Sequence, residues 1–140
     1  MASVPFHYLD LRAFCYETED EQRVEHALGT FLPKDVAVER DETEGHHGDR
    51  IIVMSTRIEL ADEMRHVLEH IRSAEAFHRV VNELTTRVDE DCAFFVRFDK
   101  QRAYRGEVAL GPGIQFRGKV ESYPAKREKA IENLRTYFLD

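Results

Sequence analysis

The sequence predicts a single α/β (α+β) domain over residues 1–140, with a mixed sheet of about five strands and helices packed on one face. A chain of 140 residues fits one domain that is large enough to bury its own core. Several stretches alternate between apolar and polar residues, which is typical of half-buried strands. Each predicted helix carries a single apolar stripe and therefore has one face to bury. The predicted order is β-α-β-β-α-α-β-β-α.

The first strand is predicted over residues 6–16, where apolar and polar side chains alternate. Its apolar face consists of Leu9, Leu11, Ala13 and Cys15. Thr18 and Glu21 have the spacing of a capping box, which predicts the start of a helix. Apolar residues then recur at helical spacing until Pro33 ends the helix.

A hairpin and two helices are predicted next. Residues 36–42 and 50–59 flank the polar, glycine-containing segment TEGHHG, a connection typical of antiparallel strands. Residues 60–71 and 74–88 each show one apolar stripe at helical spacing, so a helix is expected in each range.

The C-terminal part returns to strands and ends in a helix. Residues 92–101 alternate, and the GPG segment at 111–113 connects them to a further strand over 114–122. Residues 125–140 place Ala130, Ile131, Leu134 and Phe138 at helical spacing. These residues predict the inward face of a closing helix.

The charges divide the chain into an acidic and a basic part. The formal net charge is −7, yet residues 97–135 carry ten basic and five acidic side chains. Residues 17–44 carry ten acidic and three basic ones. We therefore expect the C-terminal part to meet an anion, while the acidic part maintains solubility.

Composition also indicates the cellular compartment. No secretory leader pattern is seen at the N-terminus and no apolar run approaches the ~18 residues of a membrane span, so we expect a cytoplasmic protein without a membrane partner. Cys15 and Cys92 lie far apart in apolar contexts, as buried thiols in a reducing compartment do.

Two histidine motifs were weighed as metal sites. HVLEH, residues 66–70, matches the H-x-x-E-H pattern of inverted zinc peptidases. Such a site needs a further carboxylate from another helix and a much larger chain, so we expect an exposed pair and no metal. Adjacent His46 and His47 between two glycines fit a plain hairpin turn, a contact with an anionic partner, or metal ligation.

The third motif is the basic stretch from Arg97 to Arg105 and the strand that follows it. Pairing across the GPG turn places Arg97, Asp99 and Gln101 beside Gln115, Arg117 and Lys119 on one polar face, with Tyr104 and Arg105 near the hairpin end. Guanidinium groups suit phosphates, amides pair with base edges, and tyrosine stacks on unpaired bases. A solvated strand face with local ion pairs explains the same residues.

Three segments of the sequence resemble a known family. RFDKQRAYRGE (97–107), TEGHHGD (43–49) and HYLDLRAF (7–14) are similar to segments of the archaeal family of RNA-binding proteins and predicted exosome subunits. The resemblance covers nearly the whole chain and implies a fold similar to that of the ribosomal protein that holds 5S rRNA. It brings no catalytic residues, and it favours RNA contact over a solvated face for the basic strand.

We therefore expect a non-catalytic RNA-binding protein without cofactors, an accessory subunit of an exosome-like RNA-processing complex. Its partners are expected to be single-stranded or structured RNA rather than duplex DNA, other subunits of such a complex, and a second copy of the chain as one option. The alternative is a protein–protein assembly module without RNA contact. The predicted RNA-binding residues are Arg97, Lys100, Gln101, Arg102, Tyr104, Arg105, Arg117, Lys119, His46 and His47.

Overall fold

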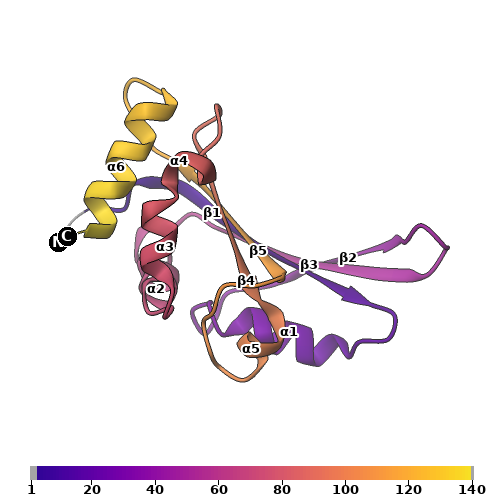
Figure 1. Ribbon diagram of the computed structural model, residues 1–140. Coiled ribbons are helices and arrows are strands. Elements are labelled where there is room, and N and C mark those ends of the chain that lie inside the picture. The colour runs from indigo at the N-terminus through magenta and orange to yellow at the C-terminus, as the bar shows by residue number, and fades with distance from the viewer. Residues whose placement is uncertain (1–2, 140) are drawn as a thin grey trace.

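The computed structural model describes residues 3–139, in which five strands and six helices form one α+β domain (Figure 1). The strands are β1 (Phe6–Tyr16), β2 (Glu39–Glu44), β3 (Arg50–Ile58), β4 (Ala93–Asp99) and β5 (Gly113–Val120). The helices are α1 (Glu21–Gly29), α2 (Ala61–Arg72), α3 (Phe77–Asn82), α4 (Leu84–Arg87), α5 (Lys100–Tyr104) and α6 (Arg127–Leu139).

The five strands form one sheet in the order β2-β3-β1-β5-β4, with β1 at its centre. Each pairing is antiparallel, which refines the expected mixed sheet. The register places Leu11 opposite both Thr56 and Phe116, so the N-terminal strand joins segments from the middle and the end of the chain. The predicted fold class is confirmed.

One face of the sheet carries the core. The strands alternate between buried and accessible residues, and the buried set packs against the helices. Phe94 is fully buried and packs against Phe116 and Phe138, with ring centroids 5.9 and 5.8 Å away. As Figure 1 shows, α1 and α5 lie together beneath one part of the sheet, and α2, α3, α4 and α6 gather at another. The opposite face carries no helix among the described residues.

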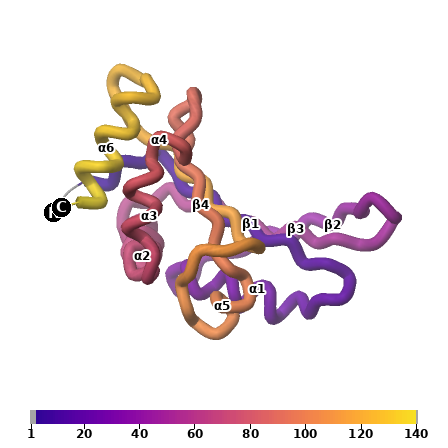
Figure 2. The backbone as a smooth tube through the Cα atoms, viewed as in Figure 1, coloured from indigo at the N-terminus to yellow at the C-terminus, as the bar shows by residue number. Residues whose placement is uncertain are grey.

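The β2–β3 hairpin extends away from the rest of the domain (Figure 2). All six residues of β2 are exposed, and four of them are acidic. Two exposed ion pairs connect the hairpin to α1: Arg40–Glu25 at 2.5 Å and Arg50–Glu21 at 2.7 Å. The predicted hairpin is confirmed, with its turn closed by a hydrogen bond from the Gly45 amide to the Asp49 carbonyl oxygen.

Two predicted helix starts and ends differ from the structure. The cap of α1 is Asp20 rather than Thr18, because the Asp20 carboxylate accepts a hydrogen bond from the Gln22 amide at 2.8 Å. The helix then ends at Gly29, ahead of Pro33. The helix expected over 74–88 is divided into α3 and α4 at Glu83, whose φ and ψ of −107° and 19° are not helical.

The strand predicted over 92–101 ends earlier than expected. Asp99 accepts a hydrogen bond from the Arg102 amide at 2.9 Å and so caps α5, which replaces the end of the strand. The chain therefore leaves the sheet at Lys100 and returns at Gly113.

The histidine pair of α2 is half-buried rather than fully exposed. His66 and His70 stack at 4.4 Å on the flank of the helix, and His70 Nδ1 lies 2.8 Å from the His66 carbonyl oxygen. Within residues 3–139, no group of three or more His, Cys, Asp or Glu side chains is arranged to hold a metal ion. None of the helices in this range is long and apolar enough to cross a membrane.

Candidate nucleic-acid interface

The uncovered face of the sheet gathers arginine and aromatic side chains from four strands. We call it the open face and define it by fourteen residues. They are Tyr8, Asp10, Arg12, Phe14 and Tyr16 of β1, Ile51, Val53, Ser55 and Arg57 of β3, Phe95 and Arg97 of β4, and Gln115, Arg117 and Lys119 of β5. Five of these fourteen residues are cationic and one, Asp10, is anionic. The same face also receives Asp99 of β4 and, through their pairing with Ser55 and Val53, Glu39 and Asp41 of β2.

A network of polar contacts holds the centre of the open face in place. Arg57 donates two hydrogen bonds to the Asp10 carboxylate, at 2.8 and 3.1 Å, and its guanidinium lies 4.0 Å from the centroid of the Tyr8 ring. Arg117 donates to the Tyr8 hydroxyl at 3.1 Å. The hydrogen bond to Asp10 raises the pKa of Arg57, so its guanidinium stays charged. The central arginines are therefore preorganised rather than mobile.

The groups around this network are more available. Arg12 donates to the Gln115 side chain at 3.2 Å, and its guanidinium lies 5.7 Å from the centroid of the Phe14 ring. Arg97 is exposed, and its side chain forms no hydrogen bond or ion pair within residues 3–139. Phe95, two residues before it on the same face, is 42% exposed. A large aromatic ring that is left in water beside an unpaired guanidinium is unusual for a plain solvated surface.

The open face contains a broad hollow of about 1000 Å³. Its floor includes Arg12, Arg57, Phe95, Gln115 and Arg117, and acidic side chains mark the end beside β2 and α2. These acids are Asp35, Glu39, Glu59 and Glu63. An anionic ligand in this hollow would therefore be attracted to the arginine floor and repelled from the acidic end.

The structure divides the predicted binding residues among three places. Arg97, Arg117 and Lys119 lie on the open face, where Lys119 donates to the Asp91 carbonyl oxygen. His46 and His47 lie in the exposed turn at the tip of the β2–β3 hairpin, and the centroids of their rings are 5.0 Å apart. The remaining predicted residues lie in α5 or directly after it. They are Lys100, Gln101, Arg102, Tyr104 and Arg105.

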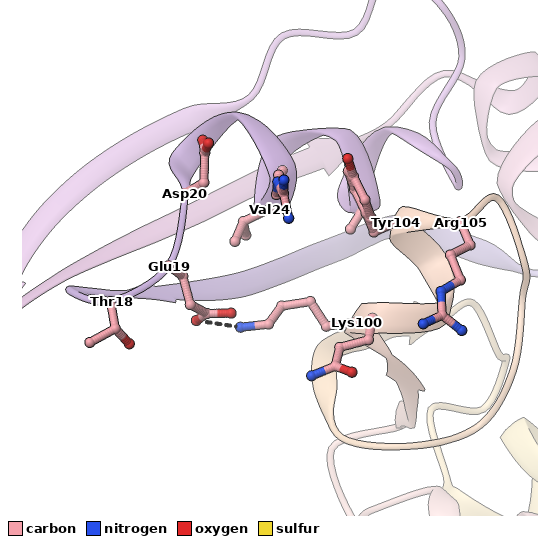
Figure 3. A pocket seen from close by; sticks show the side chains of 10 residues that line it. Thr18, Glu19, Asp20, Val24, Lys100, Tyr104 and Arg105 are labelled. Carbon is pink, nitrogen blue, oxygen red and sulfur yellow. Dashed lines mark hydrogen bonds and ion pairs between the residues drawn. The ribbon is translucent and has the colours of Figure 1, made fainter.

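The α5 residues line a separate hollow of about 480 Å³ between α1 and α5 (Figure 3). Lys100 Nζ contacts the Glu19 carboxylate and the Phe14 carbonyl oxygen, both at 2.8 Å, and its side chain is only 14% exposed. The Tyr104 ring lies 5.5 Å from the guanidinium of Arg23. Lys100 is thus engaged inside the protein.

Arg102 is also engaged locally. It donates to Glu107 at 2.8 Å, and this hydrogen bond raises the pKa of Arg102. The roles of the α5 and hairpin-tip residues in RNA binding remain predictions.

The predicted RNA-binding residues left out most of the open face, including Tyr8, Arg12, Phe14, Arg57 and Phe95. The signal for three of them was available, because the alternation that buries Leu9 and Leu11 places Tyr8, Arg12 and Phe14 on the opposite face. Arg57 could not be found in this way, since the sequence does not reveal that β3 lies beside β1.

Comparisons with known proteins support the sequence resemblance. The model of a protein family described as RNA binding matches residues 8–120. RNA-binding protein PAB1135 from Pyrococcus abyssi is 37% identical over 142 residues, which cover 94% of this chain and 92% of that protein.

Two solved structures share the fold over nearly their whole length. Mth689, a DUF54 protein from Methanothermobacter thermautotrophicus, is 37% identical with a TM-score of 0.83, and the match covers 96% of this chain and 98% of that one. Protein AF2318 from Archaeoglobus fulgidus is 28% identical with a TM-score of 0.85, covering 94% and 98%. Sequence and structure agree, and the chain belongs to the RNA-binding family whose model matches residues 8–120.

Proposed function

We propose that the protein binds single-stranded or unpaired RNA through the open face of its sheet. The observation that carries the proposal is the exposed Phe95 beside the unpaired Arg97 side chain, on a sheet face to which β1, β3, β4 and β5 contribute five cations. Family membership and the name of the Pyrococcus abyssi relative support RNA as the ligand.

The chemistry of the open face fits RNA with accessible bases. An exposed aromatic ring stacks on a base whatever its identity, and guanidinium groups bind phosphate oxygens through two parallel hydrogen bonds. A sheet face offers stacking and base-edge contacts that a closed duplex does not use, because its bases are already stacked. Gln115 adds an amide that is able to pair with a base edge.

A salt titration tests the proposal. Binding of a short unstructured RNA is measured by fluorescence anisotropy for the wild type and for the double variant Arg12→Gln, Arg97→Gln. Each lost phosphate contact on a single strand lowers the slope of log K against log salt by about 0.7, so the double variant should lose about 1.4.

The matched control is Lys126→Gln with Arg135→Gln. Both side chains are exposed, lie away from the open face and change the charge equally. The slope of log K against log salt for this control variant should equal that of the wild type. Equal losses in the two double variants would show that only net charge matters, and the open face would then not be the binding surface.

The hairpin supports a second candidate function, docking to a protein partner. β2 is an edge strand with unpaired backbone groups, and its four acidic side chains are all exposed. We propose that this strand receives a basic subunit of an RNA-processing complex, which would leave the open face free for RNA. The double variant Glu42→Lys, Glu44→Lys should abolish copurification of such a subunit without lowering RNA affinity. A variant that loses both the subunit and its RNA affinity would contradict the separation of the two surfaces.

A further inference from the structure

A second basic hollow lies at the β4 edge of the sheet. It has a volume of about 540 Å³ and is lined by Arg79 of α3, Arg87 of α4, Arg97 and Phe95 of β4, and residues 110–112. Three separate elements therefore direct arginines toward the same space.

The charges in this hollow are poorly balanced. Glu83 is the only carboxylate paired with its arginines among residues 3–139; it lies 3.7 Å from Arg79 and 3.5 Å from Arg87. Arg79 is 62% exposed, and Arg97 is unpaired. The Arg79–Glu83 ion pair is exposed on its Arg79 side and long, so it contributes little stability. The hollow thus presents three guanidinium groups against one shared carboxylate.

Arg87 occupies the place where another strand would pair with β4. Its Nη1 donates to the Phe95 carbonyl oxygen at 3.5 Å, and its Nε is buried without a hydrogen-bond partner among residues 3–139. Further along the same edge, the Gly111 amide donates to the Arg97 carbonyl oxygen. The Arg87 guanidinium is therefore fixed at the β4 edge, beside the hollow that it lines.

The hollow is continuous with the open face, because Phe95 lines the hollows on both sides of β4. We infer that an RNA strand lying on the open face continues over the β4 edge and places backbone phosphate in the hollow, on Arg79 and Arg87. This inference rests on the proposed function. It assigns the direction in which the strand leaves the sheet and an additional phosphate site.

Two RNA lengths test the inference. The four-stranded sheet of a common RNA-binding module stacks two or three bases. We therefore expect an oligonucleotide of about four nucleotides to contact the open face alone. One of about ten nucleotides also reaches the hollow. Binding of both is measured by anisotropy across a salt series for the wild type, Arg79→Gln and Glu83→Gln, with Arg135→Gln on α6 as the control of equal charge change.

We expect Arg79→Gln to lower the salt slope by about 0.7 on the longer RNA and to leave the shorter one unchanged. Glu83→Gln removes the competing carboxylate and should tighten binding of the longer RNA about 1.4- to 5-fold. Arg135→Gln should change neither.

Four results would overturn the inference. A salt slope for Arg79→Gln equal to that of the control on the longer RNA would show that the strand does not enter the hollow. If Arg12→Gln still lowered the salt slope, the proposed function would remain intact. Equal losses on both lengths would indicate a general field effect. A decaglutamate peptide that binds as tightly as the RNA, with the same dependence on Arg79, would assign the hollow to an acidic protein. No binding of either RNA by the wild type would overturn the proposed function as well.

Discussion

Phe94 and Phe95 are neighbours on β4 that point to opposite faces, and this makes them a matched pair for separating binding from stability. Phe94 is fully buried in the core, whereas Phe95 is 42% exposed on the open face. Truncation of Phe95 to alanine removes a stacking platform worth about 1–3 kcal/mol per base, which corresponds to a Kd about 5- to 160-fold higher. The same change should cost at most about 1 kcal/mol of folding free energy, the usual range for exposed strand positions.

Phe94→Ala should do the reverse. It leaves a cavity beside Phe116 and Phe138 and should lower the free energy of unfolding by about 3–5 kcal/mol. Urea unfolding followed by circular dichroism measures the stability of both variants, and anisotropy at fixed salt measures RNA affinity under conditions where each is folded. Wild-type affinity in a folded Phe95→Ala variant would refute base stacking on the open face.

Two further predictions concern the buried side of the sheet. Gly118→Ala should lower stability by about 1–3 kcal/mol in urea unfolding, because a Cβ there would lie 2.5 Å from the Phe6 ring, whereas Gly29→Ala meets nothing within 4 Å and should be close to neutral. Burial, followed by the charge of Glu19, raises the pKa of Cys15. The Cys15 thiol should therefore react with iodoacetamide far more slowly in the folded protein than in urea, and equal alkylation rates in both states would contradict this. The contribution of Cys15 to the free energy of unfolding should be constant below the unfolded thiol pKa of about 8.5 and should decline as pH rises above it. The Cys15→Ala variant should lack this decline.

The sequence predicted most of the fold because its local signals agree with the final packing. Alternation identified β1, and a polar glycine segment identified the β2–β3 hairpin. Two of the differences occurred where several local signals competed. Thr18 and Asp20 are each competent caps, and the one nearer to the first apolar turn formed the bond. At Asp99 a side-chain cap ended a strand whose alternation continued further along the sequence.

The candidate site was less predictable because it depends on strand order. Arg97, Arg117 and Lys119 were found from one hairpin, since adjacent strands in sequence usually pair. Arg57 joins them only because β1 lies between β3 and β5 and contributes Tyr8, which the guanidiniums of both Arg57 and Arg117 approach. Periodicity carries no information on such long-range pairings.

The acidic character of the rest of the molecule gives the basic open face a selective role. A protein that was basic throughout would attract RNA to every face, and its binding would carry little orientation. Here the acidic β2 strand lies at one edge of the sheet, and the arginines of the second hollow lie at the other. If the proposed function holds, this field should repel phosphate from the hairpin and attract it toward β4, so we expect a strand that meets the sheet to be aligned across it before any base contacts Phe95. Reversing the charge of Glu39 and Asp41 to lysine should therefore raise RNA affinity and weaken the dependence on Arg79, because a second path toward β2 would open. An unchanged dependence on Arg79 in that variant, measured on the longer RNA, would show that contacts at the β4 edge alone determine the direction of the strand.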